Sequence, residues 1–409
     1  MNDLQIEVEV PHYFLCPISL EIMKDPVTLA TGITYDRDSI ENWLFSQKKN
    51  VCPLTKQVVH DIELTPNHTL RRLIQSWCTL NASSGFERIP TPRIPISKTE
   101  IIKLLEDSQS PQHQITSLKS LKSIVLENDK NKLLMESVGA ADYLTTIINS
   151  ESDIMTSSSL SPAGKLAGAE ALSILYHLQL SQVGLKSLFG KTDDFVETLT
   201  RVMQRAAGDE SRAYAVMLLK SMFEVAEPMQ VTSLNPKFFT QLVQILTDQI
   251  SHKATKTTLK LLISICPWGR NRCKAAEAGL VRVLIDSLLD CKEKRTSEMA
   301  IIVLDQICQS AEGRAELLKH GGGLAVVSKK IFRVSSIASE KAVRILYSIA
   351  VFSGNMVVVQ EMLELGVVEK LLLIMQVDCG RKMKEKARDV LNMHARVWKK
   401  SPCITYTFV

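Results

Sequence analysis

The sequence predicts a mostly α-helical protein in which a small mixed α+β module precedes an all-α repeat array. Two Cys-Pro turns, Cys16-Pro17 and Cys52-Pro53, mark the first 80 residues as a loop-rich module. Three prolines within six positions, 90–95, then interrupt any regular structure. Beyond Lys98 a helical pattern recurs about every 42 residues. Because 409 residues exceed one ordinary hydrophobic core, such a division is expected.

In the first module, polar residues precede two helical patterns. Asp36 can cap a helix whose apolar face holds Ile40, Trp43 and Leu44. Asn67 can cap a second helix, with an apolar stripe at Leu70, Leu73, Ile74 and Trp77. Between Ala30 and Tyr35, a glycine at position 32 with alternating apolar residues predicts a small hairpin.

A module below ~70–80 residues usually needs additional stabilisation, such as a structural zinc ion. Structural zinc sites use ligand pairs only about two to four residues apart. The cysteines and histidines of this segment contain no such cysteine pair; they are Cys16, Cys52, Cys78, His12, His60 and His68. We therefore expect no zinc, and we expect ion pairs and hydrogen bonds in its place among Asp25, Asp36, Arg37, Glu41, Lys48 and Asp61.

This module resembles a U-box, the zinc-free relative of the RING domain in ubiquitin ligases. The resemblance spans about 65 residues and rests on these segments: Phe14-Leu15-Cys16-Pro17-Ile18-Ser19-Leu20-Glu21-Ile22-Met23, Asp25-Pro26-Val27, Gly32 to Arg37, Trp43, Cys52-Pro53-Leu54-Thr55, Leu64-Thr65-Pro66-Asn67, and Leu70-Arg71. It implies that the module binds a ubiquitin-conjugating enzyme charged with ubiquitin. Transfer to a substrate lysine would follow from proximity and orientation, with no covalent ligase intermediate.

The resemblance also assigns site residues. The groove for the conjugating enzyme maps to Cys16, Pro17, Ile18, Trp43 and Pro53. Apolar groups exposed at such positions would be unusual without a partner. Each has an ordinary alternative: Trp43 packs in the core, the prolines shape turns, and Cys16 is a buried small hydrophobe. No catalytic nucleophile is expected, because no Cys/His/acid set surrounds Cys16.

A further position, Lys56, matches the place where many relatives of the U-box carry a basic residue that contacts both the conjugating enzyme and ubiquitin. A lysine lacks the planar, forked guanidinium of arginine. The sequence therefore supports an activating contact at Lys56 less strongly than it supports docking of the conjugating enzyme. A solvated surface lysine is the alternative.

The repeat array is recognised by a small residue followed by apolar residues four and seven positions later. The six copies, whose small residues are spaced 44, 43, 42, 42 and 45 apart, are Ala171/Leu175/Leu178, Ala215/Leu219/Met222, Thr258/Leu262/Ile265, Ala300/Leu304/Ile307, Ala342/Leu346/Ile349 and the weaker Ala387/Leu391/His394. A glycine followed by an apolar helix recurs between them at Gly139, Gly279, Gly323 and Gly366. This period is typical of armadillo or HEAT repeats, and the glycine turns favour an armadillo solenoid.

The predicted domains are a U-box at 9–83, a proline-rich linker at 84–99, about six to seven armadillo repeats at 100–400, and a tail at 401–409. This order resembles a large plant ubiquitin-ligase family, and the run Leu64 to Pro92 resembles its immune and stress-signalling subgroup. The resemblance implies a protein substrate on the armadillo groove and allows a homo-oligomer formed through the U-box.

Composition limits the remaining classes. The nine cysteines include no Cys-x-x-Cys pair, which favours reduced thiols and a cytoplasmic or nuclear protein. The acidic start, Met1 to Val10, does not resemble a signal peptide, and no run approaches the ~18 apolar residues of a transmembrane helix. Residues 1–80 hold ten acidic and seven basic side chains, against 34 and 42 in the remainder, so nucleic-acid binding is poorly supported. A non-catalytic armadillo scaffold is the main alternative to a ligase, and it predicts a degenerate U-box groove.

Overall fold

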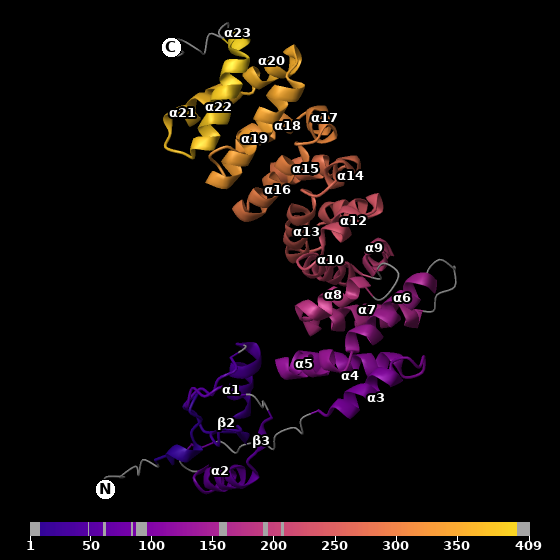
Figure 1. Ribbon diagram of the computed structural model, residues 1–409, viewed down its shortest axis with the longest axis vertical. Coiled ribbons are helices and arrows are strands. Elements are labelled where there is room, and N and C mark those ends of the chain that lie inside the picture. Colours follow the sequence, from indigo (N-terminus) through magenta and orange to yellow (C-terminus); the bar gives the residue numbers. More distant parts are fainter. Residues whose placement is uncertain are drawn as a thin grey trace. The chain divides into compact units, whose positions relative to one another are not determined.

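The computed structural model describes residues 9–47, 49–59, 63–82, 85–86, 96–154, 162–190, 195–205 and 208–398. These residues form two compact units (Figure 1). The first comprises Met1–Tyr143 with His177–Gln179, and the second comprises Leu144–Tyr176 with Leu180–Val409. The tail predicted at 401–409 and most of the proline-rich linker lie outside the described residues.

The N-terminal module of the first unit is a small antiparallel sheet with two helices. Its elements are η1 (His12–Phe14), β1 (Pro26–Thr28), β2 (Thr34–Asp36), α1 (Arg37–Glu41), the wide turn η2 (Asn42–Ser46) that continues α1, β3 (Thr65–Pro66) and α2 (His68–Leu80). The strand order is β2-β1-β3, with Val27 opposite Tyr35 and Thr28 opposite Thr65. The predicted hairpin is confirmed, because Gly32 turns the chain between β1 and β2 at a left-handed φ of 80°.

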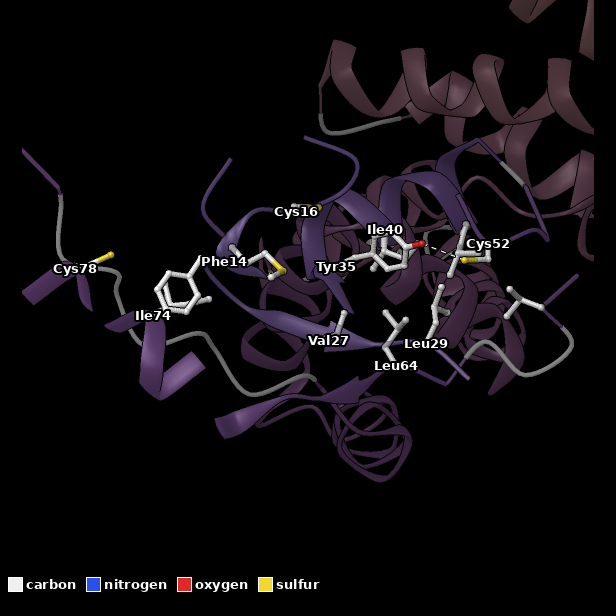
Figure 2. Packing of buried hydrophobic residues seen from close by; sticks show 13 residues of the cluster. Phe14, Cys16, Val27, Leu29, Tyr35, Ile40, Cys52, Leu64, Ile74 and Cys78 are labelled. Atoms are coloured by element: carbon white, nitrogen blue, oxygen red, sulfur yellow. Dashed lines mark hydrogen bonds between the residues drawn. The ribbon is translucent and has the colours of Figure 1, made fainter. Parts of the chain in front are cut away.

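The core of this module draws buried side chains from η1, β1, β2, α1, η2 and α2, together with Leu64 just before β3. Figure 2 shows Phe14, Val27, Tyr35, Ile40 and Ile74 among its buried side chains. All three cysteines of the module are also buried there. The predicted apolar stripe of α2 was wrong at Leu73. This residue is 53% exposed, while its neighbour Ile74 is fully buried. The apolar face of α2 is therefore narrower than its sequence pattern.

The two predicted helix caps have different outcomes. Asn67 caps α2 as predicted, since its side-chain oxygen accepts a hydrogen bond from the Leu70 amide at 3.1 Å. Asp36 does occupy the N-cap position of α1, but its side chain does not cap that helix. Its Oδ1 instead accepts the amides of Lys24 and Asp25, at 2.7 and 2.9 Å. The carboxylate thus fastens the loop that precedes β1.

The rest of the described chain is helical, and from α5 onward its helices recur as two shorter helices followed by a longer one. They are α3 (Lys98–Asp107), α4 (Gln114–Glu127), α5 (Asp129–Ser137), α6 (Ala140–Ile154), α7 (Pro162–Leu178), α8 (Gln182–Gly190), α9 (Phe195–Arg205), α10 (Asp209–Phe223), α11 (Pro228–Thr232), α12 (Pro236–Asp248), α13 (His252–Ile265), α14 (Asn271–Glu277), α15 (Leu280–Asp290), α16 (Lys294–Ile307), α17 (Ala311–Lys319), α18 (Gly323–Lys330), α19 (Ser336–Ser353), α20 (Met356–Glu364), α21 (Val367–Gln376), α22 (Arg381–Met393) and α23 (Ala395–Trp398). The fold class predicted from the sequence, a small mixed module followed by an all-α repeat array, is confirmed.

The small-residue pattern identifies the long helices of the second unit, except that Leu178, at the end of α7, belongs to the first unit. Each copy lies on one of α7, α10, α13, α16, α19 and α22, with His394 just past the end of α22. Within this unit α10, α13, α16, α19 and α22 pack on one another in succession (Figure 1). The residues of all six copies are buried except for the half-buried His394. Small side chains at these positions let neighbouring long helices approach closely, which gives the repeat one continuous core.

The recurring glycines serve two different purposes. Gly279 and Gly366 begin α15 and α21 in the left-handed region, at φ of 84° and 68°. Gly323 at the start of α18 lacks a positive φ; a Cβ there would collide with the carbonyl oxygen of Leu317. Gly139, which precedes α6 at a φ of 78°, resembles Gly279 and Gly366. The same sequence signal therefore reflects backbone conformation at three positions and close packing at the fourth.

Candidate functional site

The two Cys-Pro segments of the module fold into loops with the same backbone geometry. In the first, the Cys16 amide donates to the Glu21 carbonyl, and the Leu20 amide donates back to the Cys16 carbonyl. In the second, the Cys52 amide donates to the Gln57 carbonyl and the Lys56 amide to the Cys52 carbonyl. The fifth residue of each loop, Leu20 or Lys56, has a φ of 60°.

This equivalence extends to the stems of the loops. Leu15 bridges to Ile22 in the first loop, and Val51 bridges to Val58 at the matching positions of the second. The sequences share a pattern that could have revealed the match: Cys-Pro, then Ile or Leu, then Ser or Thr, with a β-branched residue six positions after the cysteine. Two structurally equivalent loops therefore present equivalent tips.

Consecutive residues of β2 fasten the two loops. The Tyr35 hydroxyl lies 3.0 Å from the sulfur of Cys52, as the dashed line in Figure 2 shows, and it accepts the Leu54 amide at 3.3 Å. The next amide along the strand, that of Asp36, donates to the sulfur of Cys16 at 3.3 Å. Because α1 follows β2 directly, one short stretch of chain positions both loops and the helix that leads to Trp43.

Both loop cysteines are hydrogen-bond acceptors. Burial opposes ionisation of Cys52, but hydrogen bonds from Thr31, Thr55 and Tyr35 outweigh it and lower its pKa to about 6. Burial likewise opposes ionisation of Cys16, and the backbone amides around it lower its pKa below the usual thiol value. Since both side chains are fully buried, neither sulfur can act as a nucleophile toward an outside substrate in this conformation.

That burial bears on the two roles that the sequence left open for Cys16. Cys16 is placed in the groove by the resemblance, but its side chain has no exposed surface for a partner. The alternative considered from the sequence, a buried small residue, describes this side chain. Its role is to hold the first loop to β2 through the Asp36 amide.

Trp43 joins the helix to the second loop. Its half-buried ring donates a hydrogen bond from Nε1 to the carbonyl oxygen of Val51 at 2.8 Å. The ammonium group of Lys49 lies 3.9 Å from the ring centroid, and that of Lys56 lies 5.8 Å away. The ring thus packs against the module while remaining partly exposed at the surface.

The loop tips carry apolar side chains that are at least partly exposed. Pro17 is exposed, while Ile18 and Pro53 are half-buried. Sequence reasoning missed Leu20 and Leu54, which are 74% and 59% exposed. The only sequence signal for them is that each lies close after the proline of its own turn. Exposed apolar side chains clustered on rigid loops are typical of a protein-binding surface.

Ion pairs link the elements of the module. Among the described residues, no cluster of histidine, cysteine or acidic side chains could hold a metal ion. Arg37 instead pairs with Asp25 at 2.6 Å and with Glu41 at 3.6 Å, and Arg71 lies 3.7 Å from Asp25. Of the six residues predicted to form this network, Lys48 and Asp61 lie outside the described part of the chain.

Two further findings concern the whole chain. None of the cysteines in the described residues forms a disulfide. No helix within the described ranges combines the length and apolar character that crossing a membrane requires.

Family models match both parts of the chain. The U-box domain matches residues 10–83, and the plant U-box protein ARM repeat region matches residues 99–408. A chain from a structure on the phosphorylation switch that controls the interaction between cadherin and beta-catenin has a TM-score of 0.50 at 13% identity, over 82% of this chain and 58% of that chain. At that identity the likeness concerns the fold alone.

Relatives match over nearly the full length. The E3 ubiquitin-protein ligase PUB23 of Arabidopsis thaliana is 56% identical, over 97% of this chain and 96% of its own. The E3 ubiquitin-protein ligase PUB22 of the same plant is 53% identical, over 97% of both chains. The chain therefore belongs to the family of U-box ubiquitin ligases that carry a plant U-box protein armadillo repeat region.

Proposed function

We propose that the two loop tips and Trp43 form one surface that binds a ubiquitin-conjugating enzyme charged with ubiquitin. The observation that supports this most directly is the shared attachment of both loops to consecutive residues of β2. Such attachment keeps Pro17, Ile18, Trp43 and Pro53 in fixed positions before any partner arrives. Binding to a preformed surface avoids the entropy cost of ordering loops on association.

Ubiquitin then passes directly from the conjugating enzyme to a lysine of the substrate. The ligase contributes proximity and orientation, which can supply roughly 7 to 11 kcal/mol of a reaction barrier when the alignment is good. No ligase thioester is formed in this scheme, and the complete burial of Cys16 and Cys52 supports that feature.

Lys56 is proposed to contact ubiquitin or the conjugating enzyme during transfer. It is exposed at the tip of the second loop, in the position equivalent to Leu20. Its ammonium group lies near the ring of Trp43, so it would stand at the edge of the same surface. A lysine there offers a point charge to a carbonyl or carboxylate oxygen.

The armadillo repeats are proposed to select the protein substrate. Their stacked long helices offer a continuous surface of the kind that solenoid proteins use to bind partners. In this proposal the U-box at 9–83 binds the conjugating enzyme and the repeats at 100–400 bind the substrate. The linker at 84–99 joins them, and a tail follows at 401–409. On the resemblance to the immune and stress-signalling subgroup, we further propose a cytoplasmic or nuclear role in that signalling and a homo-oligomer through the U-box.

The test is an in vitro ubiquitination assay with activating enzyme, a panel of conjugating enzymes, ubiquitin and ATP. We expect a ladder of ubiquitinated ligase with at least one conjugating enzyme, and none when that enzyme is omitted. Absence of a ladder with every conjugating enzyme, from a folded protein, would instead favour the non-catalytic armadillo scaffold.

We also propose that the U-box works without zinc. The sulfur atoms of Cys16 and Cys52, which a zinc site would need, accept hydrogen bonds from Asp36 and Thr31. Ubiquitination by protein dialysed against a zinc-selective chelator should equal that of untreated protein. A RING-type ligase treated in parallel is the control and should lose activity. Elemental analysis that finds stoichiometric zinc would contradict this prediction.

A further inference from the structure

One pocket of the second unit is lined by five cationic side chains. It lies where the loop between α15 and α16 meets the loop between α18 and α19, and it has a volume of about 160 Å³. Figure 1 shows these four helices as neighbours in the stack. The cations are Lys292, Lys294, Lys329, Lys330 and Arg333, and no carboxylate is among the lining residues.

These charges have no counter-ions within the described residues. None of the five cations lies within 4.0 Å of a carboxylate there. Glu293, the N-cap residue of α16, belongs to the same loop, but its carboxylate accepts the Thr296 hydroxyl and faces α13, where Lys256 lies 2.6 Å and His252 lies 3.0 Å away. The nearest acidic residue in sequence therefore does not neutralise the pocket.

The cations are also crowded against one another. Burial, together with the neighbouring charges of Lys329 and Arg333, lowers the pKa of Lys330. A sixth cation stands close by: the Nζ atom of Lys370 donates to the carbonyl and hydroxyl oxygens of Ser328, at 2.8 and 3.0 Å. Burial and the charge of Arg333 lower the pKa of Lys370 as well. Like charges held together destabilise a fold unless an anion relieves them.

Helix ends add to the positive potential. Lys294 is the first residue of α16, and Arg333 lies just before Ser335, the N-cap of α19. The amino-terminal ends of two long helices therefore adjoin the pocket, and such ends favour anions. An ordinary role accounts for two of the cations, because Lys329 and Lys330 lie in the last turn of α18 and complement its negative end. It does not account for Lys292, Lys294 or Arg333.

We propose that this pocket binds a phosphate monoester. A carboxylate carries one negative charge, whereas a phosphate monoester carries about 1.5 to 2 at neutral pH and offers three strong acceptor oxygens. Lysines bind phosphate as point charges, and the single arginine can add a bidentate contact. The phosphate has two possible sources, a phosphorylated residue of a protein or a small phosphorylated molecule. This inference does not depend on the proposed route of ubiquitin transfer.

The test measures binding to the full chain by calorimetry at low ionic strength. The probes are a serine-containing peptide with one phosphoserine, its unphosphorylated twin, inositol hexakisphosphate and inorganic phosphate. A triple variant carries Lys294→Ala, Lys330→Ala and Arg333→Ala. The matched control carries Lys186→Ala, Lys260→Ala and Lys382→Ala, three exposed lysines of the repeats, so both variants lose the same charge.

We expect a phosphorylated probe to bind wild type and the control alike, and the triple variant at least about tenfold more weakly. If the phosphopeptide binds and its unphosphorylated twin does not, the phosphate comes from a phosphorylated protein. If inositol hexakisphosphate binds and the phosphopeptide does not, the phosphate comes from a small molecule. Binding of inorganic phosphate alone would also support the site if the triple variant abolished it. Failure of every probe, or equal binding to the triple variant and the control, would overturn the proposal.

Folding provides a second readout. Because the cations repel one another, the triple variant should melt no lower than wild type, and a phosphorylated probe should raise the melting temperature of wild type more than that of the triple variant. A probe that stabilises both proteins equally acts elsewhere on the chain and would count against the pocket.

Discussion

Replacing Trp43 with alanine should abolish ubiquitin transfer while leaving the armadillo repeats folded. The change removes an aromatic side chain from the centre of the proposed surface, where such anchors often contribute at least about 2 kcal/mol, roughly thirtyfold in affinity. It also removes the hydrogen bond from Nε1 to Val51 and the ring beneath Lys49. The second loop would then lose its attachment to the helix.

Ubiquitination and binding of the conjugating enzyme would be measured side by side for this variant. Leu80→Ala is the matched control, because Leu80 is 81% exposed at the end of α2, a different element. Trp43→Phe separates the two contributions, since it keeps an aromatic ring but loses the hydrogen bond. Circular dichroism must show each variant to be folded. Full activity in a folded Trp43→Ala protein would refute the assignment of this residue to the surface.

Replacing Arg37 with alanine should unfold the U-box within an otherwise folded chain. Arg37 is 13% exposed, and it pairs with Asp25 and Glu41, whose side chains are 15% and 11% exposed. Removing one partner from a buried pair typically costs about 3 to 5 kcal/mol, because the remaining charges stay desolvated. A core of this size rarely supplies more than about 3 to 5 kcal/mol in total. Glu41 keeps Lys130 at 3.4 Å, so the main loss falls on Asp25. Arg71 lies near Asp25, but its 3.7 Å separation is too long to replace the 2.6 Å contact.

Amide hydrogen exchange on the full chain would locate this unfolding. We expect the amides of β1, β2 and α2 to lose protection in Arg37→Ala, while those of α10, α13 and α16 keep it. Arg72→Ala is the control, because Arg72 is an exposed arginine on α2. Unchanged protection in the U-box of Arg37→Ala would show that the ion pairs do not hold the module together.

Local rules predicted the parts of the U-box that depend on neighbours in sequence. The cap at Asn67 and the turn at Gly32 follow from side-chain chemistry and backbone freedom within a few residues. Asp36 and Leu73 escaped those rules. The Asp36 carboxylate accepts the amides of Lys24 and Asp25 in place of an amide in the first turn of α1. Leu73 is exposed because α2 packs on the core through the face that carries Ile74.

The candidate surface shows the same division. The sequence identified Pro17, Ile18, Trp43 and Pro53 through resemblance, and the structure places them on two loops and one helix edge. It could not show that Leu20 and Leu54 are exposed, because exposure depends on what packs over each loop. Nor could it show that Tyr35 contacts the sulfur of Cys52 while the Asp36 amide donates to the sulfur of Cys16, since these contacts span 17 and 20 residues.

By itself, the sequence determined the mixed module, the repeat array and the register of the long helices. Periodicity and turn chemistry are local properties, and each repeat packs mainly on its neighbours. The tertiary structure alone decided which side chains share a site. It brought five cations from two segments about 40 residues apart, 292–294 and 329–333, into one pocket. It also buried the sulfur of Cys16 beneath the surface that its loop helps to form. Such outcomes depend on packing between distant segments, and no short window of residues contains that information.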